Sequence, residues 1–442
     1  MTDTGPGFSA ETFQGRRERL LETLADGVAV LPAAPELLIS RDTEVRYRPD
    51  SNLFYLTGFS EPGAVAVLTP HDPEHRYTLF VRDRDPERER WNGPRTGREE
   101  AKQGFGADAV YPLSELDARL KELVEPARRL FYALGSDTEM DRRVVELCRG
   151  FRHSRQRSGR GPTGVEDLDP VLGRMRRIKE PAEIASMRAA ARLAAGVHRE
   201  VMARARPGAG EWQLEAAILA GFREQGASGP AYPPIVASGP NATVLHHSSN
   251  DRRIQDGDLV LVDAGAWLGM YSSDITRTFP VSGKFSEVQR AVYQVVLRAE
   301  EIAIARCRPG TPVCELHDGA VGVLAEGMIE LGLLEGDAGE LVAGGAHKRF
   351  FMHQTSHWLG IDVHDAGPYS ENGEPVLLEP GMVLTVEPGV YVPADDESVP
   401  ERLRGIGVRV EDTVLVTDDA PELLTRGVPV EPGEVEELVG KS

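Results

Sequence analysis

Residues 257–265 read GDLVLVDAG, and residues 381–389 read GMVLTVEPG. In each copy a Gly leads into an apolar run of strand length, a carboxylate ends the run, and a second Gly follows two residues later. These carboxylates are Asp263 and Glu387, and a further acid on an expected strand, Asp274 or Glu411, follows each copy. The repeat predicts two similar half-domains that face each other and bring four carboxylates to one site.

Four carboxylates at one site need compensating positive charge, because an unpaired buried carboxylate is costly or takes up a proton. Arg277 and Arg409 are candidates for part of that charge. Two divalent cations would match the four negative charges. Ligation that is rich in oxygen, with one imidazole, suits Mn-like ions better than a structural zinc, which prefers Cys and His.

Histidine is concentrated in two short segments. His246 and His247 lie in VLHHSSN, and His353, His357 and His364 lie in MHQTSHWLGIDVHD. A single His is more often structural than functional. Three within twelve positions, beside a Gly turn and an Asp, favour a functional site. The H-x-x-x-H spacing adds little, because the zinc-protease pattern requires a Glu directly after the first His.

Together these residues resemble the pita-bread metallopeptidases, the group that contains aminopeptidase P, prolidase and methionine aminopeptidase. The resemblance implies five metal ligands: Asp263, Asp274, His357, Glu387 and Glu411. It implies catalytic roles, beside Glu387, for four further residues: His246, His353, His364 and Arg409. One departure is His247, where the family pattern leads us to expect an aromatic residue.

The resemblance extends from about residue 11 to 417. Residues 48–64 (RPDSNLFYLTGFSEPGA) resemble the N-terminal domain shared by aminopeptidase P and prolidase. Residues 82–101 (RDRDPERERWNGPRTGREEA) resemble the aminopeptidase P version in particular. This implies a homo-oligomer, a dimer or tetramer, in which the N-terminal domain walls the cleft. Candidate walls for a proline ring are Trp91, Tyr232 and Tyr391.

The implied fold is α/β (α+β), a pita-bread catalytic domain with an internal pseudo-repeat after a smaller α/β N-terminal domain. Apolar patterning predicts a helix at 11–25 and strands at 27–31, 64–68 and 77–81. Pro181 indicates the start of a strong helix. A basic, Gly-rich stretch without periodicity within residues 151–170 indicates the boundary between domains 1–172 and 173–442.

Composition narrows the functional class. A net charge of −20 disfavours nucleic acid and anionic membranes as partners. No apolar run approaches the length of a membrane span, and the N-terminus has no export-signal pattern. The three cysteines, expected to be ordinary buried thiols, argue against a disulfide framework and favour a cytoplasmic protein: Cys148, Cys307 and Cys314.

The expected function is release of the N-terminal residue from peptides with proline in the second position. The resemblance implies attack by a hydroxide that bridges two divalent metals, best matched by Mn²⁺, with Co²⁺ or Zn²⁺ as alternatives. Glu387 would hold the hydroxide's proton, and His364 would polarise the carbonyl. Prolidase, which cuts only Xaa-Pro dipeptides, is the nearest alternative reading. A catalytically inactive interaction module on the same fold is the other.

Overall fold

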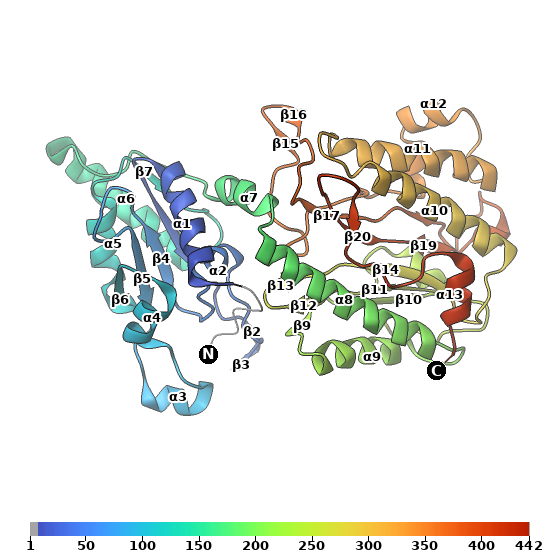
Figure 1. The fold of residues 1–442 in the computed structure, drawn as a ribbon, viewed down its shortest axis with the longest axis horizontal. Helices are drawn as coiled ribbons and strands as arrows, with labels where there is room; N and C mark the ends of the chain where they lie inside the picture. The colour runs from blue at the N-terminus through green and yellow to red at the C-terminus, as the bar shows by residue number, and fades with distance from the viewer. Residues whose placement is uncertain (1–7, 442) are drawn as a thin grey trace. The chain divides into compact units, whose positions relative to one another are not determined.

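The computed structural model describes residues 8–441 (Figure 1). The chain divides into two compact units, the first ending at Gly173 and the second beginning at Arg174. Each unit has its own buried core, so each is described by itself. No helix in the described part of the chain is long and apolar enough to cross a membrane.

The first unit is built on one mixed six-stranded sheet. Its strand order is β6-β5-β4-β1-β7-β8. The strands of this sheet are β1 (Gly27–Pro32), β4 (Val65–Leu68), β5 (Tyr77–Val81), β6 (Ala109–Pro112), β7 (Arg129–Phe131) and β8 (Gly164–Glu166). A separate two-stranded hairpin consists of β2 (Leu38–Ser40) and β3 (Thr43–Glu44). The strands expected at 27–31, 64–68 and 77–81 are therefore confirmed within one residue at each end.

Helices cover both faces of this sheet. They are α1 (Ala10–Leu24), α2 (Ser51–Thr57), α3 (Pro86–Asn92), α4 (Gly97–Phe105), α5 (Leu116–Val124) and α6 (Thr138–Ser158), with a 3₁₀ turn, η1 (Leu113–Glu115). One face of the sheet packs on α5 and α6 in a single apolar cluster. On the other side α1 and α2 pack on each other and on β1. The predicted helix at 11–25 is α1, which begins where the Ser9 side chain accepts from the Thr12 amide.

The basic stretch after Phe151 is more regular than its composition suggests. Helix α6 continues through it to Ser158 and ends where Gly159 adopts a left-handed conformation, with φ of 70°. Its basic side chains are mostly exposed, which explains the missing apolar periodicity. Irregular structure is confined to the residues between α6, β8 and α7 (Asp169–Arg177).

The second unit contains several small antiparallel sheets. Their strand orders are β10-β11-β14, β17-β20-β21, β13-β12-β9, β18-β19 and β15-β16. The strands are β9 (Gly229–Pro230), β10 (Ile235–Ser238), β11 (Leu259–Asp263), β12 (Ala266–Leu268), β13 (Tyr271–Ser272), β14 (Thr276–Pro280), β15 (Ser370–Glu371), β16 (Glu374–Pro375), β17 (Val383–Val386), β18 (Gly389–Tyr391), β19 (Gly407–Arg409), β20 (Asp412–Leu415) and β21 (Glu422–Leu423).

Two long helix pairs accompany these strands. The helices are α8 (Pro181–Arg204), α9 (Glu211–Glu224), α10 (Glu287–Ala305), α11 (Cys314–Leu331), α12 (Ala338–Ala343) and α13 (Pro432–Leu438), with 3₁₀ turns η2 (Gly239–Thr243), η3 (Ala346–Arg349) and η4 (Glu401–Leu403). Helix α8 packs on α9, and α10 packs on α11. Figure 1 shows the strands running between these two pairs. As predicted, α8 begins at Pro181, and Glu180 and Glu183 form a capping box there.

The sequence repeat is a structural repeat. In the first copy β11 pairs antiparallel with β14, and in the second β17 pairs antiparallel with β20. A bridge between Thr276 and Glu411 joins the two copies. Gly265 has a packing reason, since a Cβ there would collide with the Ser273 carbonyl oxygen. The repeat therefore sets two equivalent strand pairs against each other at their carboxylate-bearing ends.

Candidate metal centre and active site

The four acids of the repeat occupy equivalent places at strand ends. Asp263 is the last residue of β11, and Glu387 directly follows β17. Asp274 and Glu411 lie just before β14 and β20, rather than within strands as the sequence suggested. Since a strand fixes the direction of its terminal residue, these four carboxylates point into the same space.

His357 lies among these carboxylates. Its Nε2 is 3.5 Å from Asp274 Oδ2 and 3.5 Å from Glu387 Oε1. Asp274, His357 and Glu411 each offer a ligand atom, and these atoms lie within 4.8 Å of one another. The thiol ligands of a structural zinc site are absent from this cluster. The donor set, four carboxylates and one imidazole, therefore fits divalent cations that prefer oxygen.

Tyr232 links two of the acids. Its hydroxyl donates to Asp263 Oδ1 at 2.5 Å and also contacts Asp274. Burial, and then the charges of Asp263 and Asp274, raise the pKa of this phenol well above its ordinary value. The hydroxyl thus stays protonated and orients the carboxylates. The sequence placed Tyr232 among the proline-ring walls, and the structure adds this contact to the acids.

Arg409 is the buried cation beside the cluster. Its Nη2 donates to Asp263 Oδ2 at 2.6 Å, and its Nη1 donates to the Tyr391 hydroxyl at 3.1 Å. The expectation for Arg277 is wrong in part. Its guanidinium pairs with Asp412 at 2.9 Å and donates to the main-chain carbonyl of Glu411, so it holds the backbone of the cluster and leaves the four carboxylates to other cations.

Titration of the cluster reflects its burial and its crowded charges. Burial opposes the charged form of His357, but Asp274 and Glu387 outweigh it and raise the His357 pKa to about 9. Burial raises the pKa of Glu387 to about 7, although His357 and Arg409 oppose the shift. Burial and the neighbouring carboxylates also raise the pKa of Glu411 well above its ordinary value. The protein alone therefore leaves this site with surplus negative charge, which favours cation binding.

Three more histidines surround the cluster. His353 Nε2 lies 2.9 Å from the Tyr391 hydroxyl, and its Nδ1 lies 3.8 Å from Glu387 Oε2. Burial and then Arg409 lower the His353 pKa to about 4, so this ring is neutral near pH 7. The ring of His364 stands edge-on to that of His357, with centroids 4.5 Å apart.

These groups line a cavity of about 820 Å³. Most of the residues singled out from the sequence are in its wall: His246, His353, His357, His364, Asp263, Asp274, Glu387, Arg409, Glu411 and Tyr232. Tyr391 is buried and contacts His353 and Arg409 from behind the wall. Trp91 lies in α3 of the first unit and is 86% exposed.

Two residues of the cavity wall were missed or misjudged from the sequence. His317, one turn into α11, lines the cavity and lies 3.0 Å from the Thr355 hydroxyl. Cys314, at the start of the same helix, is exposed and also lines the cavity, which corrects its assignment as a buried thiol. Their i, i+3 spacing puts them on one helix face, but only the fold turns that face to the cavity.

Comparison with known proteins agrees with this geometry. The model of metallopeptidase family M24 matches residues 185–418, and that of the aminopeptidase P N-terminal domain matches residues 13–132. Xaa-Pro aminopeptidase from Escherichia coli is 42% identical over 98% of both chains, and that from Haemophilus influenzae is 39% identical over 97% of both. The solved aminopeptidase PepP from Pseudomonas aeruginosa is 45% identical and superposes with a TM-score of 0.94 over 98% of both chains.

Fold, repeat and site thus lead to one assignment. The pita-bread architecture and its α/β N-terminal domain, expected from the sequence, are those of the matched families. The chain belongs to metallopeptidase family M24, in its aminopeptidase P group.

Proposed function

We propose that this chain is an Xaa-Pro aminopeptidase, a hydrolase that releases the N-terminal residue from peptides with proline in the second position. The observation that carries the proposal is the convergence of four carboxylates and His357 in the wall of one cavity. Relatives bearing this activity in their names match almost the whole chain. A variant of Escherichia coli aminopeptidase P, 42% identical to this chain, has been solved in complex with substrate.

Two divalent ions would be held by Asp263, Asp274, His357, Glu387 and Glu411. When bound, they would supply charge stabilisation and an activated water. Mn²⁺ is our preferred ion, because four of the five ligands are carboxylates. Co²⁺ and Zn²⁺ are alternatives, and a zinc-substituted form of the Escherichia coli enzyme has been solved with product.

Proton transfer falls to Glu387 and His353. The raised pKa of Glu387, about 7, suits a carboxyl that takes a proton from the attacking water and releases it again. His353 Nδ1 lies 3.8 Å from Glu387 Oε2, within reach of a small adjustment, and its neutral ring can carry the proton toward the leaving proline nitrogen. Tyr391 fixes the other edge of that ring.

The carbonyl oxygen of the first residue needs a hydrogen-bond donor as charge develops on it. His364 is our candidate, because it lines the cavity beside His357 and its pKa is lowered by burial and by that neighbour. A neutral imidazole carries one N–H for this purpose. His246, also in the wall, is a candidate for holding the peptide.

Proline at the second position fits a site of this kind. The Xaa-Pro bond is a tertiary amide without an N–H, so a peptidase that needs that donor cannot bind it productively. We further propose a homo-oligomer, a dimer or tetramer, in which Trp91 contributes to substrate binding. A cytoplasmic location is supported by the three cysteines, which are all free.

A substrate panel tests the activity. Protein loaded with Mn²⁺ should cleave Xaa-Pro-Xaa tripeptides and leave Xaa-Ala-Xaa peptides intact, with the released amino acid measured by chromatography. Cleavage restricted to Xaa-Pro dipeptides would instead indicate a prolidase. Chelation should abolish the activity, and Mn²⁺ or Co²⁺ should restore it.

A matched pair of variants ties the activity to the cluster. Glu387→Gln should remove activity, whereas Glu379→Gln, an exposed acid just before β17, should leave it unchanged. Equal activity in both variants, or full activity after exhaustive chelation and dialysis, would count against the proposal.

A further inference from the structure

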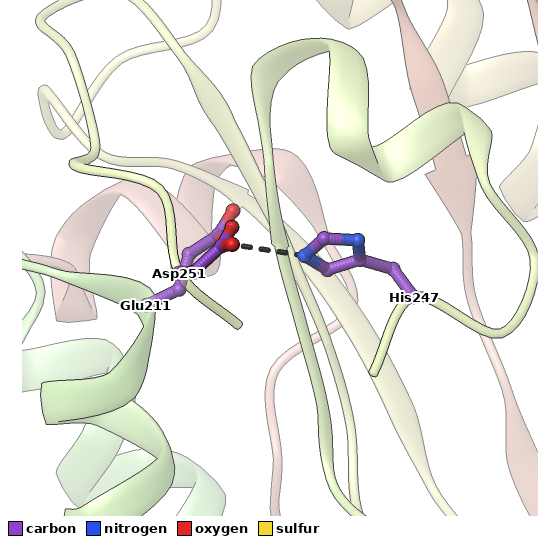
Figure 2. A group of neighbouring side chains, drawn as sticks. All are labelled: Glu211, His247 and Asp251. Atoms are coloured by element: carbon purple, nitrogen blue, oxygen red, sulfur yellow. Dashed lines mark hydrogen bonds and ion pairs between the residues drawn. The ribbon is translucent and has the colours of Figure 1, made fainter. Parts of the chain in front are cut away.

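His247 has no place in the chemistry above, although it adjoins His246. The loop after η2 turns Leu245, His246 and Ser248 into the wall of the cavity. His247 is absent from that wall and points instead toward the first turn of α9, where it faces Glu211 (Figure 2). This is the position at which the sequence departs from the aromatic residue expected for the family.

Glu211 is a fully buried carboxylate held in a fixed orientation. Its Oε1 accepts from the Ser238 amide and hydroxyl, both at 2.7 Å, and from Asn241 at 3.0 Å. Its Oε2 accepts from the Arg252 amide at 2.9 Å. Partners of this kind orient the ligating carboxylates of metal sites. The side of Oε2 that remains faces His247.

Asp251 completes the group from the solvent side. Glu211, His247 and Asp251 each offer one atom, and these atoms lie within 4.8 Å of one another. Figure 2 shows the two carboxylates together, with the imidazole nitrogen pointing at them. Because Asp251 is exposed, a hydrated ion can reach the group without passing through the catalytic cavity.

The separation of His247 and Glu211 discriminates between two occupants. Two acceptors facing a ring nitrogen require a cation between them, either a proton or a metal ion. The distance from His247 Nε2 to Glu211 Oε2 is 3.2 Å. A charge-assisted N–H···O bond is shorter, about 2.7–2.9 Å. Two ligands on a tetrahedral ion with bonds of about 2.0 Å lie about 3.3 Å apart.

The charges around the group agree with a divalent ion. Arg252 is the neighbouring cation, and its guanidinium is engaged by Asp258 at 2.5 Å and by the Ser238 hydroxyl at 2.7 Å. Glu211 and Asp251 together carry two negative charges, which one divalent ion balances while His247 is neutral.

We propose that Glu211, His247 and Asp251 form a binding site for a further divalent cation of the zinc class, separate from the catalytic pair. One imidazole and two carboxylates form a ligand set that Zn²⁺ accepts, with water in the fourth position. The ion ties the start of α9 to the loop that carries His246, so it stabilises one wall of the catalytic cavity.

Metal stoichiometry tests this site. Metal-free protein is equilibrated with Zn²⁺ and its bound metal is counted per chain. The wild type should bind one ion more than Asp251→Asn or His247→Gln, whatever the number held by the catalytic cluster. Asp251 is exposed, so its variant is expected to fold even if the His247 variant does not. Asp256→Asn, an exposed acid on the same loop, is the matched control and should bind as the wild type does.

A crystallographic arm locates the ion. Crystals soaked in Zn²⁺ should give an anomalous peak between Glu211 and His247, and this peak should vanish in Asp251→Asn. Equal stoichiometry in wild type and Asp251→Asn overturns the proposal and leaves a proton between His247 and Glu211. An equal loss in Asp256→Asn also overturns it, because the bound ion then reports surface charge alone. Neither outcome depends on peptidase activity, so failure here is separate from failure of the proposed function.

Discussion

The Tyr232 hydroxyl lies 2.5 Å from Asp263 Oδ1, and the same oxygen contacts Asp274. One phenol from the loop before β10 thus reaches both acids of the first repeat copy. A phenol carries one proton, so it donates to one carboxylate at a time while holding both near the position of the proposed ions.

Tyr232→Phe should therefore weaken metal binding by roughly 10- to 100-fold, the usual effect of losing a partner of metal ligands. Competition with a chromophoric chelator measures this loss. The fold should persist, because Phe retains the ring. An unchanged affinity would mean that the phenol serves substrate binding alone, as the sequence suggested.

Arg409→Lys should destabilise the metal-free protein by about 3–5 kcal/mol, because a buried carboxylate loses its partner. Lysine cannot reach Asp263 and Tyr391 together as the guanidinium does. Urea unfolding gives the difference, with Arg426→Lys, an exposed arginine, as the control. Equal stability of the two variants would contradict the assigned role of Arg409.

Stabilisation by metal should grow as pH rises from about 7 to about 9. In the metal-free fold, His357 has a pKa raised to about 9, so the stability from its charged ring is present below its unfolded pKa and is lost as pH rises through 9. Glu387, with a pKa raised to about 7, holds a proton below that pH, which competes with metal.

The measurement for this prediction is the difference in Tm between Mn²⁺-loaded and metal-free protein across that range. Histidines outside the cluster titrate in both forms and cancel in the difference. A Tm difference that stays constant from pH 6 to 9 would show that these groups do not release protons when metal binds.

His357 and His364 should differ when each is replaced by Ala, although their rings are 4.5 Å apart. His357→Ala should lose metal and activity together, as should Asp263→Asn and Glu411→Gln. His364→Ala should keep its metal and lose kcat by about 10²–10³-fold, the usual effect of losing one donor to a developing oxyanion. A His364 variant without metal would mean that the role assigned to this ring is wrong.

Trp91→Ala should raise KM for Xaa-Pro peptides by roughly tenfold and leave metal content and folding unchanged. The side chain is 86% exposed within its own unit, so its removal leaves no cavity in that core. Steady-state kinetics and sedimentation test the idea together. A fully active monomer at assay concentration, or an unchanged KM, would rule out the proposed contribution.

Much of the site could be predicted because it is written into local patterns. The paired acids follow repeated Gly-flanked apolar runs, and a strand that ends in a carboxylate gives that side chain a fixed direction. Asp263 and Glu387 therefore indicated a shared site before any fold was known. The helix at Pro181 and the strands of the first unit followed from equally local signals, namely caps and apolar runs.

Tertiary structure alone decided which distant groups meet. The contact of Arg277 with Asp412 joins residues that are 135 positions apart, and nothing in either segment distinguishes Arg277 from Arg409 as a partner for the acids. Likewise, His246 and His247 are neighbours in sequence, yet one lines the cavity and the other faces Glu211. The direction of a side chain in a loop depends on what packs around that loop, so only the folded chain settles it.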